Sequence, residues 1–125
     1  SEEGTLREAL SRLVHTKEVW LAAVRNQPIP EGLDKSIPGM LKRLDSSFIE
    51  FAEVVRRVRD ENRWDEHFVD ETCEQPERFS YGGMIAHVVT FSAFRRSAAL
   101  KIMEKLGVDD LGYGDPIEWE REVAR

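Results

Sequence analysis

The sequence predicts an all-α protein: a helical bundle of three long helices and a short C-terminal helix. Apolar residues recur at steps of three and four over long stretches, which is the period of an amphipathic helix. Capping residues and prolines stand where these stretches begin and end. Strand-type alternation is nearly absent, and a length of 125 residues suits a single domain over residues 1–125.

The first helix is expected from about Thr5 to Asn26. Thr5 and Glu8 form a capping box, and leucines then recur along one face. Pro28 and Pro30 end this helix, because proline lacks the backbone N–H that a helix interior needs.

The second helix is expected to begin after Ser36, an N-cap residue two positions before Pro38. Its apolar residues alternate steps of four and three: Ile37, Leu41, Leu44, Phe48, Phe51, Val55 and Val58. This is the strongest periodic signal in the chain. It predicts a straight helix that packs along its whole length at the shallow angle usual in bundles.

Residues 62–79 are expected to form a long connection, because the periodicity gives way to polar and acidic residues with isolated aromatics. A short extended piece is predicted around Phe68 and Val69. A connection of this length lets the chain cross the bundle and return in a direction that a tight hairpin forbids.

The third helix is expected to begin after the N-cap Ser80 and to end at Gly107, a C′ residue. A glycine-containing turn follows. Asp115 and Pro116 then predict a short terminal helix that lies on the bundle.

Charge and hydropathy exclude some partners. The chain has 24 acidic and 18 basic residues, a net charge of -6, which disfavours binding to nucleic acid or to anionic lipid. It has no apolar run near the length of about 20 residues that a bilayer crossing needs. The first ten residues show no export signal, so we expect a cytoplasmic protein without a membrane span.

The third helix carries the most informative pattern, with His87, Phe91 and Arg95 expected on its inward-looking face at four-residue steps. Its sequence, SYGGMIAHVVTFSAFRRSAALKIMEKLG, resembles the last core helix of the DinB/YfiT-like four-helix-bundle family, where the pattern is His-x-x-x-His-x-x-x-His-Arg-Gly. The TLR-type entry and the exit with LGVDD and GDPIEW extend the likeness over most of the chain. The resemblance implies an up-down-down-up helix order, in which the first helix here corresponds to the family's second and the family's own first helix is missing.

The resemblance also implies a changed metal site. Arg12, Phe91 and Arg95 stand where the family has its metal-binding histidines, and His87 keeps the first histidine of the pattern. A guanidinium offers no lone pair to a metal ion, so we expect no metal at the usual site. Metal-bearing relatives are suspected or known thiol transferases or act in maleylpyruvate isomerisation. Without the metal, that chemistry has no evident activator for the thiol.

Two interpretations of the substituted pocket follow. In the first, Phe91 and the stem of Arg95 fill a decayed cavity, and the arginines pair with carboxylates or reach solvent. In the second, Arg12 and Arg95 converge and bind a small anionic molecule, a carboxylate or phosphate, through their planar forks of donors. The second interpretation requires that both arginines approach one common pocket. The sequence supports no catalytic mechanism, and the protein is expected to be a small-molecule-binding, anion-binding or structural bundle.

The alternative is a metal-dependent enzyme that acts on thiol conjugates or another small substrate. If the first and third helices are antiparallel, His15 and His87 reach a common level. Glu18 and His67 complete a relocated set for zinc or nickel.

A homodimer is also expected. Three long amphipathic helices leave one face of a bundle uncovered, so a second copy of the chain is the expected partner.

Overall fold

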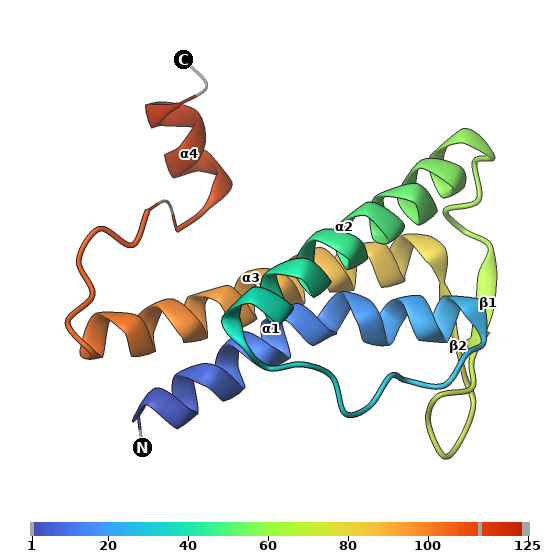
Figure 1. The fold of residues 1–125 in the computed structure, drawn as a ribbon. Coiled ribbons are helices and arrows are strands. Elements are labelled where there is room, and N and C mark those ends of the chain that lie inside the picture. The colour runs from blue at the N-terminus through green and yellow to red at the C-terminus, as the bar shows by residue number, and fades with distance from the viewer. Residues whose placement is uncertain (1, 113, 124–125) are drawn as a thin grey trace.

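A computed structural model describes residues 2–112 and 114–123 of the chain, with side chains from Gly4 onward in the first helix. In chain order the elements are α1 (Glu2–Arg25), α2 (Ile37–Asp60), β1 (His67–Asp70), β2 (Glu77–Ser80), α3 (Tyr81–Lys105) and α4 (Pro116–Glu122) (Figure 1). The described chain is mostly helical, which confirms the all-α class. Within it, no helix combines the length and the apolar character needed to cross a membrane.

The helices α1 and α2 run parallel. Arg43 of α2 binds Glu18 of α1, with Nη2 2.6 Å from Oε1, and further along both helices Arg25 Nη1 lies 3.3 Å from Glu50 Oε1. Residues 26–36 therefore return along the bundle, as Figure 1 shows. Eleven residues span about 36 Å when extended, the length of a helix of about 24 residues. The crossing connection is this segment, so its expected place at residues 62–79 is wrong.

The helix α3 runs antiparallel to α1 (Figure 1). The ring of Trp20 lies 5.3 Å from that of His87, whereas Arg12, earlier in α1, shares a pocket with Arg95, later in α3. The bundle therefore consists of two parallel helices, α1 and α2, and a third helix, α3, that runs in the opposite direction.

The predicted N-caps of α2 and α3 are confirmed, but the predicted start of the first helix at the Thr5 and Glu8 capping box is wrong, since α1 begins at Glu2 and Thr5 lies within its first turns. Ser36 Oγ accepts a hydrogen bond from the N–H of Gly39 at 3.1 Å, and Ser80 Oγ accepts one from Gly83 at 3.0 Å. Gly107 follows α3 with φ of 83°, a left-handed conformation that favours glycine. These local signals explain why the start of α2 and both ends of α3 fall where the sequence predicts them.

The connection between α2 and α3 folds as a β-hairpin. The extended piece around Phe68 and Val69 is confirmed as β1, which pairs antiparallel with β2 in the register His67 to Ser80. The second strand was not predicted, because its sequence ERFS begins with two exposed charged residues and lacks an apolar alternation. Phe68 is buried, so the hairpin contributes to the core and closes this end of the bundle.

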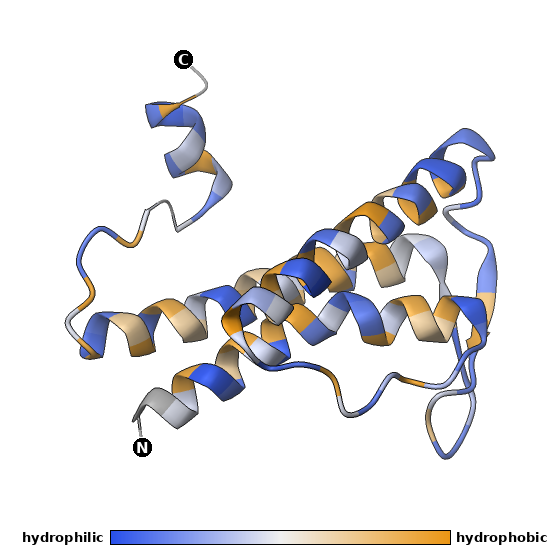
Figure 2. Cartoon of the chain, in the orientation of Figure 1, coloured by the Kyte–Doolittle hydropathy of each residue, from blue (hydrophilic) through white to orange (hydrophobic). Residues whose placement is uncertain are grey.

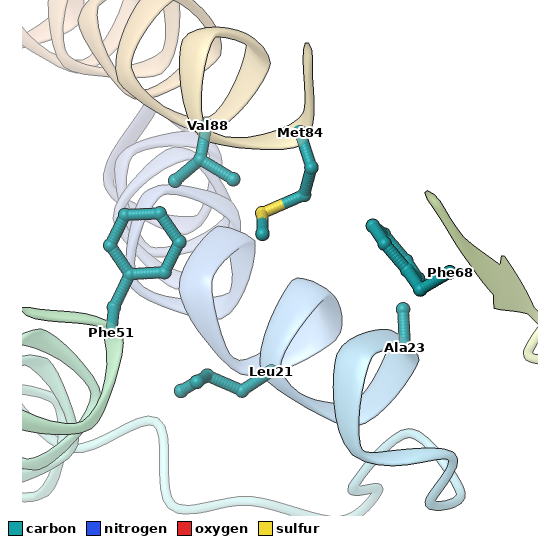
Figure 3. Close-up of a cluster of buried hydrophobic side chains, with 6 residues drawn as sticks. All are labelled: Leu21, Ala23, Phe51, Phe68, Met84 and Val88. Carbon is teal, nitrogen blue, oxygen red and sulfur yellow. The ribbon is translucent and has the colours of Figure 1, made fainter. Parts of the chain in front are cut away.

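The core lies toward the hairpin end. Its central cluster draws on all three long helices and on β1: Leu21, Ala23, Phe51, Phe68, Met84 and Val88 (Figure 3). Met84 and Val88 are at most 2% exposed. Burial of apolar side chains from every long element holds the bundle together at this end.

The apolar stripe of α2 is covered along part of its length. Met40, Phe51 and Val58 are buried, but Leu41 and Phe48 remain 58% and 61% exposed. The expectation that α2 packs along its whole length is therefore wrong: α1 and α3 contact one side of it and leave apolar residues on the other. Figure 2 shows hydrophobic and hydrophilic residues interspersed along this helix.

The short helix α4 forms at the predicted place but does not lie on the bundle. Asp115 caps it by accepting hydrogen bonds from the N–H groups of Ile117 and Glu118. None of its residues is buried, and Figure 1 shows it projecting away from the long helices. The reason is the connection before it: Gly107, Asp110 and Gly112 have positive φ angles, and the chain turns away from the bundle there.

Candidate functional site

A pocket opens between α1 and α3 at the end of the bundle opposite the hairpin. Its volume is about 320 Å³, and it is lined by Thr5, Glu8, Ala9, Arg12, Arg95, Ala98 and Ile102. Arg12 and Arg95 thus line one pocket. Binding of one anion by both arginines requires this arrangement. The antiparallel packing of α1 and α3 brings them together.

Arg95 is held against aromatic rings. Its Cζ atom lies 4.7 Å from the ring centroid of Phe91 and 6.0 Å from that of Phe94. Such cation–π contacts fix the plane of the guanidinium. The Nε atom of Arg95 is buried and has no hydrogen-bond partner within the described residues. A buried donor without an acceptor is costly, so this atom marks a place for an acceptor.

Arg12 is exposed, and its side chain makes no ion pair with any described residue. Glu8, the carboxylate in the pocket wall, lies 3.2 Å from Lys35 Nζ. The two arginines therefore keep their positive charges without a carboxylate partner from the described chain. The arrangement attracts anions.

His87 belongs to a ladder of aromatic rings. Its ring stacks on Phe91 at 5.1 Å, and the edge of Trp20 meets it at 5.3 Å. Phe79 of the hairpin extends the ladder, with its centroid 5.6 Å from that of Trp20. His87 is exposed, so its expected place on the inward-looking face of α3 is wrong. Its ring and that of Phe91 connect the hairpin to Arg95.

The residues of the relocated metal set are not gathered into one site. His15 Nδ1 lies 2.9 Å from Glu18 Oε1, so two of the four do meet. His87 stacks on Phe91, and His67 is exposed at the start of β1. Over residues 2–112 and 114–123, no three histidine, cysteine or acidic side chains form a group suited to a metal ion.

Glu18 is instead part of an ion pair. Arg43 donates to both of its oxygens, at 3.0 Å from Nε and 2.6 Å from Nη2. Burial raises the pKa of the Glu18 carboxyl, but the hydrogen bonds from Arg43 and His15 more than offset this, so the pKa is lowered overall. This carboxylate is committed to joining α1 to α2.

A second pocket, of about 240 Å³, lies at the hairpin end and has a different charge balance. Three arginines line it. Arg25 pairs with Glu50 and Arg63 Nε lies 2.7 Å from Glu66 Oε2, whereas Arg57 has no ion pair among the described residues. Two of its three arginines are thus neutralised by ion pairs within the chain, and Glu50 and Glu53 add negative charge to the lining. The pocket of Arg12 and Arg95 is the better candidate for a charged ligand.

Sequence reasoning missed the other residues that line the pocket of Arg12 and Arg95. Helical spacing contained the signal for them. Glu8 stands four residues before Arg12, and Ala98 and Ile102 follow Arg95 by three and seven. Residues at these steps share a helix face.

Comparison of the chain with protein-family models gives no match, and comparison with curated proteins and with solved structures gives none either.

Proposed function

We propose that this protein binds a small carboxylate- or phosphate-bearing molecule in the pocket of Arg12 and Arg95. The observation that carries the proposal is the buried Nε of Arg95, which has no partner in the described chain. A carboxylate or phosphate oxygen supplies the acceptor that this donor lacks, and its charge matches both guanidinium groups.

The surroundings favour a ligand with an apolar part. Ala9, Ala98 and Ile102 line the same pocket as the arginines. Apolar walls lower the local dielectric constant and strengthen the hydrogen bonds to a bound anion. A volume of about 320 Å³ is at the lower end of the range for small-molecule sites, so we propose a short organic acid or a small phosphate ester.

We further propose that the chain is a divergent, cytoplasmic member of the DinB/YfiT-like bundles. The parallel α1 and α2 with an antiparallel α3 support this, because the resemblance implies that order for these three helices. On this proposal the positive charge of the lost metal ion is replaced by two guanidinium groups, so the pocket still favours anions. The sequence motifs and the pocket favour a binding function over the alternative enzyme with a relocated metal site.

Isothermal titration calorimetry with inorganic phosphate and with butyrate tests the proposal. We expect saturable binding by the unchanged chain. Arg95→Lys keeps the charge but removes the fork of donors, and Arg12→Gln removes one charge. Each should weaken binding about tenfold, the loss of about one charge-assisted hydrogen bond.

Arg78→Gln is the matched control, because Arg78 is an exposed arginine on the hairpin strand β2, outside the pocket. It should leave the affinity for both ligands unchanged. Binding that Arg12→Gln and Arg95→Lys do not weaken, or that Arg78→Gln weakens equally, would refute the assignment of the site. No heat of binding with either probe would also contradict it.

A further inference from the structure

An apolar groove of about 450 Å³ runs between α2 and α3, on a different side of α3 from the anion pocket. Six apolar residues line it: Phe48, Phe51, Ala52, Val55, Val88 and Val89. Phe48 and Val89 are 61% and 63% exposed. The groove is the uncovered face that a three-helix bundle leaves.

The polar groups of the groove are basic or unpaired. Lys17, Arg56 and Arg96 also line it, and no acidic residue is among its lining residues. Burial, and to a lesser extent the charge of Arg96, lowers the pKa of Lys17. Ser92 Oγ is buried and has no partner within the described residues. The groove therefore fits an occupant that is apolar, acidic and able to hydrogen-bond to a hydroxyl.

The helix α4 with Val123 has these properties, and we call it the α4 arm. Trp119 and Val123 stand four residues apart on one face and are 49% and 50% exposed. Glu120 and Glu122 flank this face, and the indole N–H of Trp119 is a hydrogen-bond donor. The two surfaces are thus complementary in hydropathy, in charge and in hydrogen-bonding groups.

We infer that the protein forms a dimer by exchange of α4 arms, in which the α4 arm of each copy lies in the groove between α2 and α3 of the other. Trp119 covers the phenyl ring of Phe48, and its indole N–H donates to Ser92 Oγ. Glu120 and Glu122 meet the basic rim. If each arm and each groove buries about 300 Å², two exchanged arms bury about 1,200 Å², the lower limit for a specific interface.

A second copy fits the position of the arm better than the chain's own bundle does. Figure 1 shows α4 projecting away from the long helices, so the arm and the groove of one chain are both open. Reciprocal exchange about a two-fold axis covers both grooves at once and leaves no unpaired arm. The inference does not depend on the anion site, since the groove and that pocket share no lining residue.

Light scattering during size-exclusion chromatography of the full chain tests the inference. The unchanged chain should have the mass of a dimer. Trp119→Glu in the arm and Phe48→Glu in the groove should each halve the measured mass, while circular dichroism stays unchanged because both residues are exposed in the single chain. Ile49→Glu is the matched control: Ile49 is 58% exposed on the same helix as Phe48 but does not line the groove, so this variant should remain dimeric.

Mixing the two variants distinguishes exchange from the alternatives. The Phe48→Glu chain has an intact arm and the Trp119→Glu chain an intact groove. An equimolar mixture should therefore form heterodimers through one working contact, which buries about half the area and needs a higher protein concentration than the dimer of the unchanged chain. The comparison is made at the highest concentration at which each variant alone stays monomeric. A monomeric unchanged chain would overturn the inference, as would a Trp119→Glu variant that stays dimeric through direct packing of helix faces. A mixture that stays monomeric, as docking of the arm in its own groove predicts, would overturn it as well.

Discussion

The two ends of this bundle are built differently. At the hairpin end Phe68 closes the core cluster, and two of the three arginines in the pocket are paired, Arg25 with Glu50 and Arg63 with Glu66. At the other end Arg12 and Arg95 share a pocket without a carboxylate partner from the described chain, and α4 stands away from the helices.

The difference separates stability from binding. Groups that satisfy one another within the chain stabilise the fold and offer little to a ligand. Groups left unsatisfied cost stability and are available to an external partner. On this comparison the hairpin end carries the stability of the bundle, and the open end carries its interactions.

The largest expected effect is at the hairpin end. Met84→Ala should lower the free energy of unfolding by about 3 kcal/mol, because Met84 is 2% exposed within the core cluster and its loss leaves a cavity. Phe94→Ala, at the open end of the same helix, should cost less than about 1 kcal/mol, because Phe94 is 61% exposed. Urea denaturation followed by circular dichroism measures both. Equal losses of unfolding free energy in the two variants would contradict the view that the hairpin end stabilises the bundle and the open end binds partners.

The ion pair between α1 and α2 should have an intermediate effect. Glu18→Gln leaves Arg43, which is 13% exposed, without its carboxylate and should cost about 2 kcal/mol. Glu50→Gln is the matched control in an exposed pair of the same two helices, and should cost less than about 0.5 kcal/mol. Thermal and urea unfolding of both variants at neutral pH test this. A Glu50→Gln variant as unstable as Glu18→Gln would show that burial does not determine how much these ion pairs contribute to the free energy of unfolding.

The contribution of Glu18 should disappear in acid. Its pKa is lower in the folded chain than in the unfolded chain, so the stabilisation is complete above the unfolded pKa and is lost as the pH falls through the folded value. The difference in stability between the unchanged chain and Glu18→Gln should therefore be constant at neutral pH and shrink from about pH 4.3 downward. A difference that persists unchanged in strong acid would mean that Glu18 acts through packing and not through its charge.

The fold was predictable where the signal is local. Ser36, Ser80 and Gly107 mark helix ends through caps or backbone conformation, and these depend on a few neighbouring residues. The crossing connection and β2 were not predictable in this way. The path of residues 26–36 depends on how α1 and α2 pack, and β2 is a strand because β1 pairs with it.

The candidate site was predictable in part for the same reason. The meeting of Arg12 and Arg95 follows from antiparallel helices, which the resemblance implies. The relocated metal set also required that the side chain of His87 face that of His15. In the structure the ring of His87 instead stacks on Phe91 and contacts the ring of Trp20. The spacing of residues along a helix predicts the height of a side chain along the bundle. It does not predict which side chain of a neighbouring element that residue contacts.

The smallest expected effect is the most informative about the open end. Arg95→Met keeps the bulk of the side chain and removes the buried Nε, so in a buffer free of phosphate and carboxylate it should raise the free energy of unfolding by about 1 kcal/mol. Phosphate should raise the melting temperature of the unchanged chain and leave that of the variant unaltered. Arg12→Met, at an exposed position, should weaken the phosphate effect without the gain in stability. If Arg95→Met is destabilising instead, the contact of its guanidinium with Phe91 outweighs the unpaired donor, and the open end is stabilised by its own side chains as the hairpin end is.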